Sequence, residues 1–180
     1  MIIITAVGKD RPGMAHALAT QLAQSGCNIE DTTMTRLSGE FAMILIVSPP
    51  PNLGVEALSQ QLKPLEASHG LFINVRDIDE ENESDESEIP RYLLSVYGPE
   101  RSGLVAQITG VLAAHNVNIT DVQTRVASAG AVYVMLFEIE IPTESHVDTS
   151  STQSLQDALE KAAQEIGAQV SLRQIESETL

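Results

Sequence analysis

The hydrophobic positions of the first 77 residues change period repeatedly, between the two-residue repeat of strands and the three-to-four-residue repeat of helices. An apolar run rich in β-branched residues comes first and predicts a strand buried on both faces. The expected elements are, in order, a strand at residues 2–7, a helix carrying Met14, Leu18 and Leu22, strands at residues 28–37 and 41–47, a helix carrying Val55, Leu58, Leu62 and Leu65, and a strand with Leu71, Ile73 and Val75. The order is β-α-β-β-α-β.

Residues 92–172 repeat this order with clearer helical spacing. The expected elements are a strand at residues 92–97, a helix carrying Leu104, Val105, Ile108, Val111 and Leu112, strands at residues 118–126 and 131–141, a helix carrying Leu155, Leu159, Ala162 and Ile166, and a last strand beginning with Val170 and Leu172. Two local expectations concern prolines. Pro12 suits the first turn of a helix, and Pro64 should shorten or kink the last turn of the second one.

The chain is an internal duplication with an offset of 90 residues. Residues 8–14 read Gly-Lys-Asp-Arg-Pro-Gly-Met, and residues 98–104 read Gly-Pro-Glu-Arg-Ser-Gly-Leu. Between Gly8 and Asp31 the offset gives eight identities in 24 positions. A repeat of this length overrides the single-domain expectation for a chain of 180 residues. We therefore predict two domains, residues 1–77 and 91–176.

Residues 78–90 are predicted to be an acidic linker. Eight of the twelve residues from position 77 to 88 are acidic, which leaves 17 acidic against 10 basic residues elsewhere. Such a stretch cannot pack and is expected to be solvated. A calcium-binding loop is the alternative, but the stretch lacks the glycine that its turn requires.

The net charge of −15 argues against direct binding to nucleic acid, which needs a basic face. The single cysteine, Cys27, excludes an internal disulfide framework, and no charged-then-apolar leader or long apolar span is seen. We expect a cytosolic protein that neither contacts a membrane nor carries a metal or cofactor. The four histidines lack the spacing of metal ligands, and no arrangement of nucleophile, base and orienting acid points to an enzyme.

The duplicated glycine loops are candidate anion sites, because each joins a strand to a helix and presents a helix N-terminus. Arg11 and Arg101 offer a bidentate partner for a carboxylate. A zwitterion also needs a partner for its ammonium group, and the start of the next strand supplies one in each copy. These residues are Asn28, Asp31, Asn118 and Asp121.

Structural explanations of the same residues remain open. A glycine loop between a strand and a helix is often only a turn, and a duplication shows shared ancestry rather than retained binding. Asp31 and Asp121 are equally compatible with capping or with ion pairs to Arg36 and Arg125. Arg11 and Arg101 are also compatible with a purely solvated role.

Two β-α-β-β-α-β units with these loops resemble tandem ACT domains, which are small amino-acid-sensing modules. The resemblance rests on Asp10-Arg11-Pro12-Gly13 and Glu100-Arg101-Ser102-Gly103 with Asn28-Ile29-Glu30-Asp31 and Asn118-Ile119-Thr120-Asp121. It implies an α+β fold of two ferredoxin-like domains, each a four-stranded antiparallel sheet with both helices on one face. The implied ligand-binding residues are Asp10, Arg11, Gly13, Met14, Asn28, Ile29 and Asp31, and Glu100, Arg101, Gly103, Leu104, Asn118, Ile119 and Asp121.

A free-standing pair of such domains is similar to the glycine cleavage system transcriptional repressor family. That resemblance implies a non-enzymatic regulator that responds to glycine or a similar amino acid and acts through a DNA-binding transcriptional activator. The chain departs from the family pattern at His16, Ala17 and Ser102. Two other functions stay open, a free-standing regulatory subunit of an amino-acid metabolic enzyme and a ligand-free assembly module whose edge strands pair, within the chain or in a homodimer.

Overall fold

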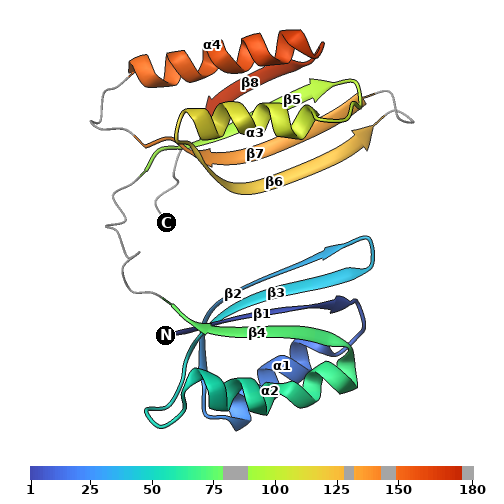
Figure 1. The fold of residues 1–180 in the computed structure, drawn as a ribbon, viewed down its shortest axis with the longest axis vertical. Coiled ribbons are helices and arrows are strands. Elements are labelled where there is room, and N and C mark those ends of the chain that lie inside the picture. The colour runs from blue at the N-terminus through green and yellow to red at the C-terminus, as the bar shows by residue number, and fades with distance from the viewer. Residues whose placement is uncertain (79–88, 128–131, 143–148, 176–180) are drawn as a thin grey trace. The chain divides into compact units, whose positions relative to one another are not determined.

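The structure of the protein, a computed structural model, describes residues 1–78, 89–127, 132–142 and 149–175. The chain divides into two compact units, Met1–Ser84 and Asp85–Leu180, and each has the order β-α-β-β-α-β (Figure 1). The first consists of β1 (Ile2–Lys9), α1 (Met14–Gln24), β2 (Asn28–Leu37), β3 (Glu40–Ser48), α2 (Val55–His69) and β4 (Leu71–Asp77). The second consists of β5 (Arg91–Gly98), α3 (Leu104–Ala114), β6 (Asn118–Ala127), β7 (Val132–Glu140), α4 (Thr149–Glu165) and β8 (Gln169–Gln174).

Each unit contains one antiparallel four-stranded sheet. The strand orders are β2-β3-β1-β4 and β6-β7-β5-β8, so the first and third strands of each unit are central. Both helices of a unit cover the same face of its sheet (Figure 1). The expected α+β fold with two ferredoxin-like units is confirmed.

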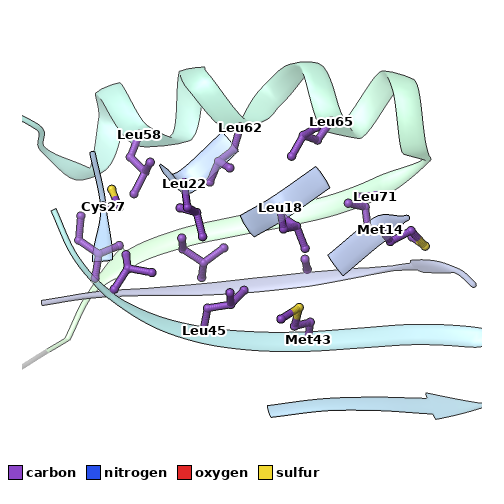
Figure 2. Close-up of a cluster of buried hydrophobic side chains, with 14 of the residues drawn as sticks. Met14, Leu18, Leu22, Cys27, Met43, Leu45, Leu58, Leu62, Leu65 and Leu71 are labelled. Carbon is purple, nitrogen blue, oxygen red and sulfur yellow. The ribbon is translucent and has the colours of Figure 1, made fainter. Parts of the chain in front are cut away.

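The core of the first unit lies between its sheet and its helix pair. Met14, Leu18 and Leu22 recur at helical spacing along α1 and are almost fully buried. They meet side chains of β3 from one side and the leucines of α2 from the other (Figure 2). Burial of these apolar side chains is the main stabilising term of a unit this small.

The second unit repeats this core with different residues. Leu104, Ile108 and Leu112 of α3 are buried, as are Leu155 and Leu159 of α4. They pack on the sheet together with Leu94, Val96, Met135, Phe137 and Ile139. The residues that the helical spacing of α3 identified are therefore core residues, although Val105 is 39% exposed.

The expectation that β1 is buried on both faces is wrong. Ile2, Ile4 and Ala6 point to the helices and are buried, whereas Val7 lies on the other face and is 38% exposed. The reason is that the helices cover only one face of each sheet. The apolar residues of the uncovered face therefore stay partly exposed.

The expectation that Pro64 shortens α2 is also wrong, because the helix continues through Pro64 to His69. Pro12 lies in a turn before α1, which begins at Met14. No helix among the described residues is long and apolar enough to cross a membrane. In the same part of the chain, no three His, Cys, Asp or Glu side chains are grouped as metal ligands.

Candidate ligand-binding site

The repeated arginine-glycine stretch forms a tight turn before the first helix of each unit. Gly13 has φ 95° and ψ −6°, and Gly103 has φ 89° and ψ −5°. These are the angles of the third residue of a type II turn, a position that strongly favours glycine, with proline common at the second. Arg11-Pro12-Gly13 fits that preference, so the two glycines have a structural role whether or not a ligand binds.

The helices that follow these turns begin without a side-chain cap among the described residues. The first intrahelical hydrogen bonds run from the Ala17 amide to the Gly13 carbonyl, 2.8 Å, and from the Gln107 amide to the Gly103 carbonyl, 2.9 Å. The amides before them have no partner within the helix and carry the positive end of its dipole. Both turns therefore present donors suited to an anion.

In the second unit these donors border an open cavity of about 670 Å³. It is lined by Glu100, Arg101, Ser102, Gly103, Leu104, Val105, Ala106 and Tyr133. Val105 and Ala106 belong to the first turn of α3, and Tyr133 enters from β7, where it lies opposite Gly98 of β5. An arginine, a glutamate, a tyrosine and the first turn of a helix thus line one space.

The corresponding groups of the first unit have partners of their own. Arg36 of β2 forms an ion pair with Asp10 at 3.3 Å, and the Asp10 amide donates to the carbonyl oxygen of Gly39 at 2.8 Å. The Arg11 amide donates to Sδ of Met14 at 3.2 Å. These contacts fasten the first loop to its own unit.

The second unit lacks two of the side chains that make these contacts. Arg36 lies opposite Phe41 in the first sheet, and the matching pair in the second sheet is Val126 and Tyr133. Met14 is replaced by Leu104, which has no acceptor atom. Consequently no arginine at the matching strand position can engage Glu100, and the Arg101 amide has no sulfur acceptor at residue 104.

Within one unit, the structure does not bring the strand residues of the expected site near the loops. Asn28 of β2 lies opposite Ser48 of β3. The neighbouring β3 residue, Val47, lies opposite Ile2, so Asn28 is at the end of the sheet where β1 begins. The loop follows Lys9 at the other end of that strand, so roughly 20 Å separate them. The same register holds for Asn118, which lies opposite Glu140, the partner of Arg91.

The strand residues have local roles in their own units. The Asp31 carboxylate accepts the Thr32 amide at 2.7 Å, and the Asp121 carboxylate accepts Nε2 of Gln123 at 3.3 Å. Since Arg36 pairs with Asp10, the alternative in which Asp31 pairs with Arg36 is wrong. The side chain of Asn118 donates to Glu140 at 3.1 Å.

Asn28 also acts locally, by donating from Nδ2 to Glu30 at 3.0 Å. Hydrogen bonds from Ser48 and then from Asn28 lower the pKa of the Glu30 carboxyl, because they favour its charged form. Glu30 lies at a β-bulge between Ile29 and Asp31, and the second sheet has the equivalent bulge between residues 119 and 121. The repeated Asn-Ile-x-Asp motif thus encodes a bulged strand.

The apolar members of the expected site belong to the cores. Met14 is 1% and Leu104 is 2% exposed, and Ile29 and Ile119 pack against the two cores. Sequence reasoning missed Tyr133, because the two copies align without gaps only as far as Asp31. The sequence feature that could have identified Tyr133 is its position near the start of β7, which brings it opposite Gly98, the first glycine of the loop.

Comparison with known proteins agrees with this architecture. The glycine cleavage system transcriptional repressor of Escherichia coli K12 is 24% identical over 172 residues, covering 95% of this chain and 88% of that protein. A crystal structure of an unknown protein from Galdieria sulphuraria superimposes with a TM-score of 0.78 at 27% identity, covering 97% and 98% of the two chains. A crystal structure of a putative glycine cleavage system transcriptional repressor gives a TM-score of 0.70 at 18% identity, covering 98% and 97%, and it shows the shared fold.

The family model that matches is the ACT domain, and it does so twice, over residues 1–76 and 91–173. The two matches span almost all of the two repeats that the offset of 90 residues defined. Together with the strand order and the paired helices of each unit, they show that this chain belongs to the ACT-domain family as a tandem of two such domains.

Proposed function

We propose that this protein is a non-enzymatic regulator that binds a small amino acid at the start of α3 and signals its presence to a protein partner. The carrying observation is the cavity of about 670 Å³ beside the uncapped first turn of α3. Membership of the ACT-domain family and similarity to a transcriptional repressor support the regulatory role.

The cavity has a partner for each charge of an amino-acid zwitterion. The carboxylate would accept hydrogen bonds from the first-turn amides of Val105 and Ala106 and from the guanidinium of Arg101. The ammonium group would be held by the carboxylate of Glu100, which lines the same space. Tyr133 would contact whatever the ligand carries on its α-carbon, and glycine or a similarly small amino acid is our candidate.

Of the two repeated loops, the second is the better candidate for the working site. In the first, Asp10 is paired with Arg36 and the Arg11 amide with Met14, so a ligand would have to displace both contacts. The strand residues Asn28, Asp31, Asn118 and Asp121 lie far from the loop of their own unit. They remain candidate ligand-binding residues, but for an amino acid that is not bound at the loop of the same unit.

A regulator of this kind works through a difference in affinity. The form that binds the protein partner and the form that does not must bind the amino acid with different affinities, because otherwise the ligand shifts no equilibrium. With a net charge of −15, the chain is suited to act on DNA through a partner, and a DNA-binding transcriptional activator is the partner we propose.

Calorimetric titration with glycine, serine and a panel of other amino acids tests the site. We expect saturable binding by the full chain that is lost in Arg101→Ala and retained in Arg11→Ala, the matched variant in the first loop. Equal binding by both variants would contradict the assignment to the second loop. No binding by any of the three proteins would contradict the sensor itself.

The partner is tested separately, by measuring the affinity of the protein for a candidate DNA-binding activator with and without the amino acid. A change in affinity, matched by an equal change in ligand affinity when the partner is present, is the expected result. Unchanged affinities would remove the regulatory mechanism. Recovery of a metabolic enzyme in place of an activator from cells would identify a regulatory subunit instead.

A further inference from the structure

The uncovered face of the first sheet carries a largely apolar surface, which we call the open face. It consists of Ile3, Thr5 and Val7 of β1, Ala42, Ile44 and Ile46 of β3, and Phe72 of β4. Phe72 is 69% and Ile44 is 40% exposed, as large side chains on this face. Val7 lies between Ala42 and Phe72, so that row is apolar, whereas Ile44 lies between Thr5 and Thr33. Large apolar side chains grouped and exposed on one face are typical of an interface.

Opposite charges lie at the two edges of the open face. Asp31, Ile46, Ile3 and Arg76 form one row across the four strands. Asp31 is on the outer strand β2, and Arg76 is on the outer strand β4. Three strand spacings, roughly 14 Å, separate these two edges, so the two charges cannot pair within one sheet. The row has a negative end, an apolar middle and a positive end.

Such a row is complementary to itself under a twofold rotation about an axis parallel to the strands. The rotation turns a second sheet face down on the first and exchanges its left and right edges, so Asp31 of each sheet meets Arg76 of the other. Sheets stacked in this way lie about 10 Å apart, a distance that the side chains of the two faces fill. The same rotation places Phe72 over Thr35 and Val7 over Ala42, so a large side chain meets a smaller one in each case.

We propose that the open face of the first sheet is a homodimer interface, on which a second copy of this chain stacks face to face. The interface has an apolar centre of isoleucines and two symmetric Asp31–Arg76 pairs at its rim. Apolar burial supplies the affinity, and the charge pairs select the orientation of the two sheets. This inference goes beyond the proposed ligand site, and nothing in it depends on that site.

The second sheet offers an internal comparison. Its uncovered face keeps the rim charges, with Asp121 and Arg173 in one row. Its centre is more polar, because Glu138 occupies the position of Ile46 and Gln169 that of Phe72. Matched substitutions on that sheet therefore serve as controls.

Sedimentation analysis of the full chain over a range of concentrations tests the interface. We expect a wild-type dimer that Ile44→Asp converts to a monomer, while Tyr97→Asp on the second sheet leaves it dimeric. Both side chains are about equally exposed, 40% and 44%, so each variant should keep its fold, as checked by circular dichroism. A wild-type monomer at concentrations up to about 1 mM, or a dimer that Ile44→Asp does not weaken, would overturn the proposal. A dimer that Ile44→Asp does not weaken would point instead to another interface, such as pairing between outer strands of two copies.

Charge reversal tests the orientation and does not depend on the apolar substitution. Asp31→Arg or Arg76→Asp alone should raise the dimer dissociation constant at least about tenfold, because each places two pairs of like charges in contact. The double variant should restore it to within about threefold of wild type. The same exchange at Asp121 and Arg173 should have no effect. If the double variant is as weak as the single ones, the twofold arrangement is wrong.

Discussion

Gly8 lies against the backbone of Gly70, so closely that a Cβ on Gly8 would be 2.6 Å from the carbonyl oxygen of Gly70. The second unit repeats this approach, where a Cβ on Gly98 would be 2.7 Å from the Cβ of Ala168. The first glycine of each repeated loop is therefore required where the first strand passes the start of the last one. Its recurrence reflects packing, whereas the second glycine of each loop forms the turn.

A Gly98→Ala substitution should destabilise the second unit by about 1–3 kcal/mol, because the added methyl overlaps Ala168. Gly110→Ala is the matched control. Nothing lies within 4 Å of a Cβ at this helical position, so the change should stabilise by roughly 0.5–1 kcal/mol. Urea unfolding of both variants measures the difference, and similar midpoints for the two would show that the close approach is unimportant.

Proline at position 102 should stabilise the second loop. The residue is at the second position of the turn, where the first copy already has Pro12. Ser102→Pro should add about 0.4–1 kcal/mol by restricting the unfolded chain, whereas Gly103→Ala should cost about 1 kcal/mol because of its φ of 89°. Thermal unfolding distinguishes the two. A destabilised Ser102→Pro variant would mean that the turn is not of type II.

Removal of the charge of Glu100 should weaken amino-acid binding about tenfold, which corresponds to about 1.4 kcal/mol. The physical reason is the loss of the proposed counter-charge to the ligand ammonium group. Glu100→Gln keeps the size of the side chain, and Asp10→Asn provides the equivalent change in the first loop. Calorimetry with glycine compares them. Greater loss in Asp10→Asn would place the working site in the first unit.

The Glu30 carboxyl should show a pH-dependent contribution to stability. Its pKa in the folded state is lowered, chiefly by the hydrogen bond from Ser48, so its stabilising effect is present above the unfolded-state pKa and disappears as the pH falls through the folded-state value. Ser48→Ala should therefore destabilise the protein at neutral pH, and this cost should shrink as the pH falls below the usual glutamate pKa of about 4.3.

Thr32→Val is the control for this titration. It removes a hydrogen bond of 3.0 Å from the Thr32 hydroxyl to the Ile44 carbonyl, which involves no titrating group. The cost of Thr32→Val should be independent of pH over the same range, as measured by urea unfolding. A cost of Ser48→Ala that is equally independent of pH would contradict the role of the hydrogen bond to Glu30.

Much of the fold was predictable because it depends on local patterns. The spacing of Met14, Leu18 and Leu22 marked the buried stripe of α1. Gly26 and Gly167, which follow helices, adopt a positive φ that glycine reaches readily. The expected shortening of α2 at Pro64 did not occur, because tertiary packing overrode local preference. Leu62 and Leu65, on either side of it, are both held in the core.

The candidate site was only partly predictable. Arg101 and Gly103 are neighbours in the chain, so their shared loop followed from the sequence. Tyr133 is far from them in the chain and reaches the cavity only through the pairing of β7 with β5. Sequence reasoning also could not show that Asn28 and Asp31 lie far from the loop of their own unit, because helix α1 carries the chain to the far end of the sheet.

The sequence by itself determined the duplication, the order of elements and the chemistry of the loops, because each of these resides in neighbouring residues and in their period. Only the tertiary structure decided which groups share a cavity and which are already paired, because strand register sets the neighbours of residues such as Arg36 and Tyr133. It also decided which apolar residues remain uncovered. A period of two distinguishes the faces of a strand, and the placement of the helices determines which face is buried.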